Sequence, residues 1–317
     1  MSTMTTKAPL RARQSYRHEA YLWHSRAEFV EGLVPFVREG IDAGEAVIVG
    51  LTAEHAWWLR EELGDVAGQV IFVDLVDLGR NPARIIPALQ EFLASSCGPG
   101  RPARAVGETI WAGRGPEEIR ECELHEALLN LAVDPHLPFW LLCLYDAEQL
   151  APAVLNEAAR SHPAIATATS YEGSGRYRGQ EHAEVLFADQ LPRRTRPAAT
   201  IPVTGLTLAA AMETLTWQAA SSDLFSDRVV VLAEVVRGLA VEALHRGANR
   251  VRVKVWDEPQ TLVCEVADRA VIRDFLVGRR QPPCPEQHSV WFANQVCDLV
   301  QLRSSEHGTT IRLHLQK

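Results

Sequence analysis

Polar and aromatic side chains that could bind a small molecule lie at the ends of two predicted strands. Glu108, Trp111 and Arg114 end or follow a strand predicted at 103–108, and Tyr145 ends a later one. Open α/β sheets bind ligands at the carboxyl ends of their strands. We therefore expect these four side chains to line a sensing pocket, although Trp111 also fits a core position.

Two histidines are further candidates for this pocket. His18 stands among apolar and aromatic residues, and His125 lies four residues after Glu121 on a predicted helix. Both have simpler interpretations, a hydrogen-bonded core histidine and an ordinary contact on a helix face. Together with Cys122 and Cys143 these histidines could also form a metal site. Their spacing matches no usual zinc-ligand pattern, so we expect no metal.

Composition excludes several classes of protein. Hydrophobic residues make up 47% and charged residues 23% of the 317 residues, and the formal net charge is -8. This acidity argues against a nucleic-acid binder or a protein of anionic membranes. No apolar run is long enough to cross a membrane. The six cysteines form no C-x-x-C pair, and the polar start lacks a secretion signal. We expect a cytoplasmic protein.

The order of predicted elements indicates two domains. After a tail at 1–14, helices and apolar strands alternate through 15–190, as in a layered α/β domain. The predicted strands are 19–24, 46–50, 70–74, 103–108 and 139–145, and the predicted helices include 27–43, 53–63, 81–95 and 116–131. A linker rich in Pro, Arg and Thr is predicted at 191–205. The second domain then covers 206–317, with two helices, a strand hairpin, a further helix and closing strands.

Long motifs in residues 16–170 keep the order found in a known sensory family. They are YRHEAYLWHSRAEFVEGLVPFVREGIDAGEAVIVGL, LGRNPARIIPALQEF, GETIWAGRGPEEI, ECELHEALLNLA, LLCLYD and SHP. This region resembles the MEDS domain, a sensory module related to the RecA/KaiC-like α/β fold. The resemblance implies a domain that senses a small molecule or a partner. The phosphate-binding motif of RecA-like domains is missing, because VIVG at 47–50 is followed by LTAE without a lysine.

Two short motifs late in the chain have other residues where a known family has glycine. Asp268-Arg269-Ala270 ends a predicted strand, and Gln287-His288-Ser289 precedes a predicted helix. This resembles the ATP-binding part of the GHKL family, an α+β sandwich found in anti-sigma-factor serine kinases, which has Asp-x-Gly and Gly-x-Gly here. In an active member the Asp contacts the adenine amine. Ala270, Gln287 and Ser289 put side chains where phosphate needs bare backbone. Asp268 equally fits a turn at the strand end.

The predicted helix before these motifs also departs from the family. Aligned on Arg246, it has Gly238 at the family's Glu and Glu242 at the family's Mg²⁺-binding Asn. If the alignment is shifted back by one helical turn, Glu234 stands at the family's Glu and Gly238 at the family's Asn. Neither register supplies an asparagine, although a Glu242 carboxylate could still bind Mg²⁺. We therefore expect no cofactor, and binding of ATP and Mg²⁺ that is weakened or lost.

Together the resemblances imply a signalling or transcription regulator. The first domain would sense an unknown small molecule, and the second would bind a sigma factor or a STAS-type anti-sigma antagonist without phosphotransfer. A homodimer is compatible with this interpretation, and no direct contact with nucleic acid or membrane is expected. One alternative is an active ATP-dependent serine/threonine kinase that phosphorylates the antagonist. The other is a small-molecule sensor whose second domain serves only dimerisation.

Overall fold

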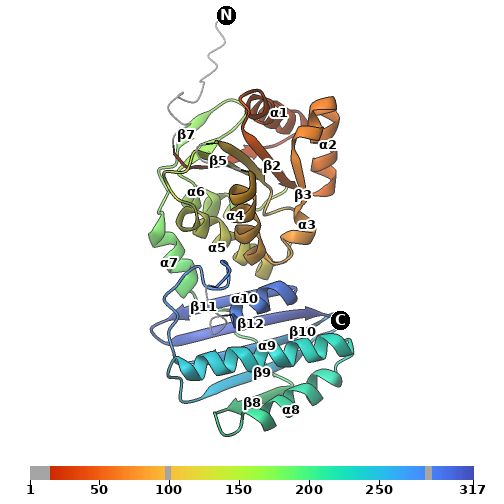
Figure 1. Cartoon of the computed structure of the whole chain (residues 1–317), viewed down its shortest axis with the longest axis vertical. Helices are drawn as coiled ribbons and strands as arrows, with labels where there is room; N and C mark the ends of the chain where they lie inside the picture. The colour runs from red at the N-terminus through yellow and green to blue at the C-terminus, as the bar shows by residue number, and fades with distance from the viewer. Residues whose placement is uncertain (1–14, 97–100, 283–287) are drawn as a thin grey trace, which may run out of the picture. The chain divides into compact units, whose positions relative to one another are not determined.

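The protein is a mixed α/β protein with two sheets. Its computed structural model describes residues 15–96, 101–282 and 288–317, and the chain divides into compact units at 1–183 and 184–317 (Figure 1). The first unit contains a mostly parallel sheet and the second an antiparallel one. Three residues considered in the sequence analysis lie outside the described residues. They are Gln287 of the GHKL-like motif and the cysteines Cys97 and Cys284.

The described sheet of the first unit has seven strands in the order β3-β2-β4-β5-β1-β6-β7. All neighbours are parallel except the hairpin of β6 and β7. The strands are β1 (Arg17–Trp23), β2 (Ala46–Leu51), β3 (Ile71–Asp74), β4 (Ala103–Gly107), β5 (Phe139–Asp146), β6 (Ala164–Ala166) and β7 (Tyr171–Gly173). Central strands such as β5 are almost continuously apolar, because helices cover both faces of a parallel sheet.

The helices of the first unit form a layer on each face of this sheet. Figure 1 shows α1 and α2 on one side and α4, α5 and α6 on the other. The helices are α1 (Arg26–Asp42), α2 (Ala53–Leu63), α3 (Leu75–Leu78), α4 (Ile85–Ser96), α5 (Pro116–Ala132), α6 (Pro152–Ser161) and α7 (Gln180–Ala188), with short 3-10 turns at Gly64–Gln69 and Pro82–Arg84. α7 crosses the boundary between the units.

Alternation along β1 divides its side chains between the two layers. Tyr21 and Trp23 belong to the apolar core beneath α1 and α2, together with Phe29 and Leu33 of α1. His18, three residues before Tyr21, therefore faces the opposite layer, because successive side chains of a strand point to opposite faces. The His18 side chain, a candidate from the sequence, thus lies under α5 and α6.

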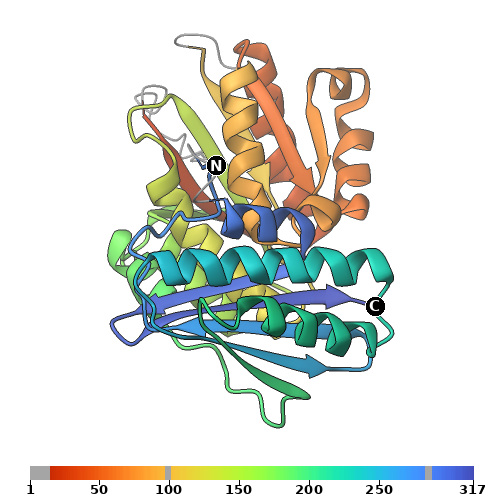
Figure 2. The same ribbon diagram turned by 60° about the horizontal axis from the view of Figure 1, so that its bottom comes forward.

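Among its described residues, the second unit consists of an antiparallel sheet in the order β11-β12-β10-β9-β8 and of helices that follow β8, α8 and β10 in the chain. Figure 2 shows α8, α9 and α10 on one face of this sheet. The elements are β8 (Ala199–Val203), α8 (Leu208–Ala220), α9 (Ser226–His245), β9 (Val251–Asp257), β10 (Thr261–Asp268), α10 (Ser289–Val296), β11 (Leu299–Ser305) and β12 (Gly308–Gln316). Val251, Val253 and Val255 are fully buried, and Arg252 between them is exposed.

Two expected elements differ from the structure more than the others do. The helix expected at 81–95 starts at Ile85, because Asn81 first caps a 3-10 turn that contains Pro82. The expected linker at 191–205 contains β8, which pairs with β9. β8 is an edge strand, where Pro202 is tolerated because its missing N–H leaves one fewer unpaired donor on the sheet edge.

Candidate functional site

Four buried polar side chains meet beneath α5 and α6. They are His18 of β1, Glu126 of α5, Cys143 of β5 and His162, which directly follows α6, and each is at most 2% exposed. One ligand-type atom from each residue lies within 4.8 Å of the other three. We call this set the His-Glu-Cys-His cluster.

The sheet register and the two helices bring the cluster together. β1 and β5 are parallel neighbours, and Ala20 pairs with Cys143 two residues along from His18. α5 packs against α6. His18 Nε2 lies 3.3 Å from both Glu126 Oε2 and Cys143 Sγ, and His162 Nε2 lies 3.4 Å from Glu126 Oε2.

Asn130 fixes the orientation of His18. Its Nδ2 donates to the backbone carbonyl of Ser161 at 2.8 Å, so its Oδ1 is the atom that faces His18 Nδ1, at 3.1 Å. An amide oxygen only accepts, so His18 Nδ1 carries a proton. The same holds for His162 Nδ1, which lies 2.8 Å from the carbonyl oxygen of Ala158. Both Nε2 atoms therefore point into the cluster and carry a lone pair whenever the imidazole is neutral.

Burial and mutual interaction perturb the protonation of these groups. Burial and the neighbouring His162 lower the pKa of His18. Burial would raise the pKa of Glu126, but the neighbouring His162 and His18 hold that pKa well below the ordinary value. Burial and Glu126 raise the pKa of the Cys143 thiol. Strongly perturbed groups gathered in one place mark a candidate functional site.

An apolar pocket of about 70 Å³ adjoins the cluster. Side chains of β2, β4, α4 and α5 form its walls, including Ile48, Leu89 and Leu129, and Ala88 of α4 also lines it. Cys143 and His125 line it as well, so Cys143 belongs to both the pocket and the cluster. The pocket can hold a small apolar group. Its described lining contains no carboxylate, lysine or arginine side chain that could pair with a charged ligand.

The six residues predicted for a sensing pocket fall into separate places. His18 lies in the cluster, His125 lines the apolar pocket, and the Tyr145 ring lies edge-on to His162 at 5.7 Å. Trp111 and Arg114 stack on each other at 3.6 Å, and Arg114 donates to the carbonyl of Gly79.

Glu108, the sixth of these residues, belongs to a different pair. One of its carboxylate oxygens lies 2.6 Å from His55 Nδ1, and the other accepts from the Thr52 backbone N–H at 3.1 Å. Trp23 and Trp58 surround the His55 ring. Burial lowers the pKa of His55, but the bond to Glu108 outweighs it and raises that pKa.

Of the four residues that the sequence offered as metal ligands, the structure brings His18 and Cys143 together, but with Glu126 and His162. Cys122 instead donates to the carbonyl of Thr109 at 3.4 Å. Glu126 and His162 were not considered as metal ligands, although the ELHEALLN run and the SHP motif contain them. The usable signal was the Glu126–Asn130 spacing of four residues, which places a carboxylate and an amide on one helix face.

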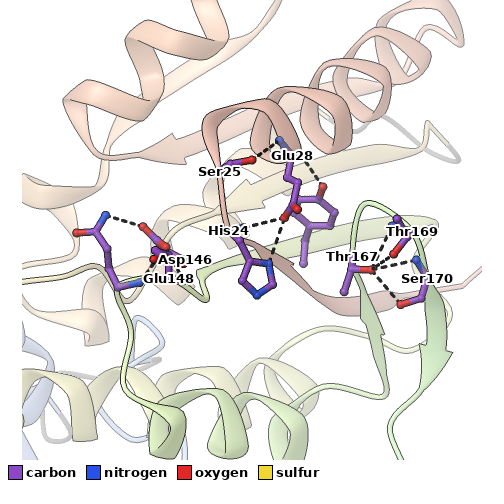
Figure 3. Close-up of polar contacts among 10 residues, drawn as sticks. His24, Ser25, Glu28, Asp146, Glu148, Thr167, Thr169 and Ser170 are labelled. Carbon is purple, nitrogen blue, oxygen red and sulfur yellow. Dashed lines mark hydrogen bonds and ion pairs between the residues drawn. The ribbon is translucent and has the colours of Figure 1, made fainter.

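The carboxyl ends of β1, β5 and β6 carry a second set of polar contacts (Figure 3). The Glu28 carboxylate accepts from the backbone N–H of His24 at 2.8 Å, and Ser25 caps α1. Asp146 accepts from the backbone N–H of Glu148 at 3.0 Å. The loop after β6 is held by Thr167, which accepts from the backbone of Ser170. These side chains close the loops at this edge.

In the second unit, the positions of the expected nucleotide site are occupied by internal contacts. Glu242 Oε1 accepts from the backbone N–H of Ser289 at 2.8 Å, at the start of α10. A Cβ on Gly238 would lie 2.6 Å from Ser289 Oγ and 3.2 Å from Ser289 Cβ, so a side chain at this position of α9 would require Ser289 to move. Asp268 accepts from the Ala270 N–H at 2.6 Å, and its other oxygen lies 3.5 Å from Arg246. Burial raises the pKa of Asp268.

A wide pocket of about 1120 Å³ lies on the same unit, on the sheet face that bears Arg252 and Lys254. Nine lysine and arginine side chains and three carboxylates line it. Several of these charges pair internally, as Arg312 does with Glu265 at 2.8 Å. The surface is nevertheless cationic on a chain whose net charge is -8.

Residues 17–163 match the sequence model of the MEDS family, described as the MEthanogen/methylotroph, DcmR Sensory domain. The match covers most of the first unit and contains all four residues of the cluster. Over these residues the chain is similar to the MEDS domain, and this similarity indicates a signalling or regulatory role. No curated protein matches the chain. In the described residues, no helix has both the length and the apolar composition of a membrane span.

Proposed function

We propose that this protein is a signalling regulator whose first unit binds a small apolar molecule and whose second unit binds a protein partner. The observation that carries the proposal is the apolar pocket inside a domain that matches a sensory family. A RecA/KaiC-like fold for the first unit and a GHKL-type fold for the second are parts of this proposal.

The size and chemistry of the pocket limit its ligand. A volume of about 70 Å³ is roughly half that of the cavity of about 150 Å³ that binds benzene in another protein. The ligand is therefore an uncharged molecule of a few heavy atoms. Burial of each CH₂ group contributes about 0.8 kcal/mol. Four such groups give about 3 kcal/mol, which corresponds to an affinity weaker than about millimolar.

The second unit is proposed to act by binding alone. The N-terminus of a helix is a ready-made anion site, and at α10 the Glu242 carboxylate already fills it. A nucleotide phosphate would meet this carboxylate. Gly238 offers no side chain for Mg²⁺, and Glu234 is exposed and paired with Arg237. These contacts support a nucleotide-independent, anti-sigma-type binding domain.

The proposed partner is a sigma factor or a STAS-type anti-sigma antagonist. The cationic pocket of the second unit supports a partner that presents acidic side chains, because complementary charge guides association. For the apolar ligand to change partner affinity, the protein must exchange between a conformation that binds the partner strongly and one that binds it weakly. The ligand must then bind one of these conformations more tightly than the other.

Thermal unfolding with apolar probes of graded size tests the sensing function. Cyclopropane dissolved under pressure to roughly tens of millimolar, well above the expected dissociation constant, should raise the unfolding temperature of the full-length protein, because a ligand bound only by the native state stabilises it. Naphthalene should not. Ala88→Leu should abolish the effect by filling the pocket, while Ala94→Leu, an exposed position on the same helix, should preserve it. No stabilisation of the wild-type protein, or equal stabilisation of Ala88→Leu, contradicts the proposal.

A further inference from the structure

We propose that the His-Glu-Cys-His cluster binds one divalent transition-metal ion of the zinc type. The ligands would be Nε2 of His18 and His162, a carboxylate oxygen of Glu126 and Sγ of Cys143. This proposal is independent of what the neighbouring apolar pocket binds, since it depends only on the four side chains and on Asn130.

Three of the six distances between the ligand atoms fit tetrahedral coordination, and all six are within 4.8 Å. Zinc lies about 2.0–2.2 Å from nitrogen and oxygen ligands and about 2.3 Å from sulfur, so adjacent ligand atoms of a tetrahedron are about 3.3–3.6 Å apart. His18 Nε2 lies 3.3 Å from Glu126 Oε2 and 3.3 Å from Cys143 Sγ. His162 Nε2 lies 3.4 Å from Glu126 Oε2.

The atoms that face the centre of the cluster lack hydrogen-bond donors. The Nδ1 protons of His18 and His162 are donated outward, to Asn130 Oδ1 and to the Ala158 carbonyl. With neutral imidazoles, the four inward atoms then share a single proton, that of the Cys143 thiol. Lone pairs and a carboxylate that face one another without a donor are strongly unfavourable in a buried site. A cation at their centre removes this conflict.

A divalent ion also balances the charge. On binding, Cys143 releases its thiol proton to solvent and becomes a thiolate, and the sulfur and Glu126 then each contribute one negative charge. The dication neutralises both, so the buried site has no net charge. Nitrogen and sulfur ligands select zinc-type ions over Mg²⁺ and Ca²⁺, which prefer oxygen.

The outward hydrogen bonds are those expected of metal-binding histidines. Such a histidine almost always donates its second ring N–H to a carbonyl or carboxylate, which orients the ring. Asn130 and the Ala158 carbonyl do this for His18 and His162. All four ligands come from the protein, which is the pattern of a structural site rather than a catalytic one. The ion would join β1 and β5 to α5 and the end of α6.

Metal content and cobalt spectroscopy on the untagged full-length protein test the proposal. Protein from cells grown with added Zn²⁺ should contain one zinc per chain. Protein from cells grown with Co²⁺ should show the visible bands of tetrahedral cobalt and a sulfur-to-cobalt charge-transfer band. Cys143→Ser should lose the charge-transfer band. Cys122→Ser removes a buried thiol on α5 outside the cluster and should keep it.

Two results would overturn the metal site. One is wild-type protein with a native circular dichroism spectrum and no bound metal, which would leave a protonated imidazole as the cation of the cluster. The other is a cobalt spectrum that is unchanged in Cys143→Ser. Should Cys143→Ser fail to fold, Glu126→Gln, which preserves side-chain shape, must show a reduced metal content with the sulfur band retained on any cobalt that remains.

Discussion

The carboxylate of Glu242 accepts a hydrogen bond from the backbone N–H of Ser289, the first residue of α10. The two residues are 47 positions apart, and the bond joins α9 to the start of the next helix of the unit. Helix N-termini carry unpaired N–H groups and a partial positive charge. Here an internal side chain supplies the anion that such a terminus attracts.

Replacing Glu242 should destabilise the second unit. We expect Glu242→Ala to lower the free energy of unfolding by about 1–2 kcal/mol, because α10 loses a charged hydrogen-bond acceptor. Urea denaturation measures the change. Glu234→Ala, which removes an exposed carboxylate from the same helix, should stay within about 0.5 kcal/mol of the wild-type protein. Equal effects of the two substitutions would show that the Ser289 contact contributes nothing.

Nucleotide should not bind to the second unit. In isothermal titration with Mg-ATP and Mg-ADP, we expect no heat of binding up to millimolar nucleotide, because Glu242 occupies the helix terminus and because Ala270 and Ser289 carry side chains at positions where the proposed GHKL-type fold would have glycine. An intact anti-sigma serine kinase is the positive control. Micromolar binding would contradict the proposed loss of nucleotide chemistry, and phosphate transfer to a STAS-type antagonist would then need to be assayed.

Asn130 should influence metal affinity without touching the metal. We expect Asn130→Ala to weaken zinc binding about 10–100-fold, because His18 loses the acceptor that orients its ring. Competition with a chromophoric chelator measures the affinity. Gln90→Ala removes another side-chain amide that donates to a carbonyl at the end of α5, and it should leave the affinity unchanged. Equal affinities for wild type and Asn130→Ala would exclude the orienting role.

The His55–Glu108 pair should make stability depend on pH. Glu108 raises the pKa of folded His55 above its unfolded value of about 6.5. The stabilisation is therefore complete below that unfolded value and is lost as pH rises through the higher folded pKa. Glu108→Gln should consequently cost most stability in mild acid and progressively less at alkaline pH, as measured by urea denaturation. Replacing the exposed His136 with Gln should leave the pH profile unchanged.

The fold was easier to predict than the site. Apolar runs such as those of β2 and β5 predicted buried parallel strands, because only strands covered on both faces remain apolar throughout. Which of the adjacent residues His125 and Glu126 faces His18 depends on how α5 is rotated against the sheet, and the sequence of α5 alone does not define that rotation. The contribution of His162 depends on where α6 ends.

The edge strand β8 shows the same limit. Its sequence, ATIPV, lies in a stretch whose Pro, Arg and Thr content predicts a connection. Pairing with β9 overrides that composition, because Ile201 and Val203 bury their side chains in the core of the second unit. Local composition cannot report a partner strand that is some 50 residues away in the chain.

The most direct test of the sensing function is a crystal structure of the full-length protein under xenon pressure. Xenon enters dry apolar cavities and reports their position as a strong density peak. We predict a peak between α4 and α5, against Leu89 and Leu129, that is missing in Ala88→Leu and present in Ala94→Leu. A first unit without a xenon peak at this position, or with the same peak in Ala88→Leu, would contradict the account.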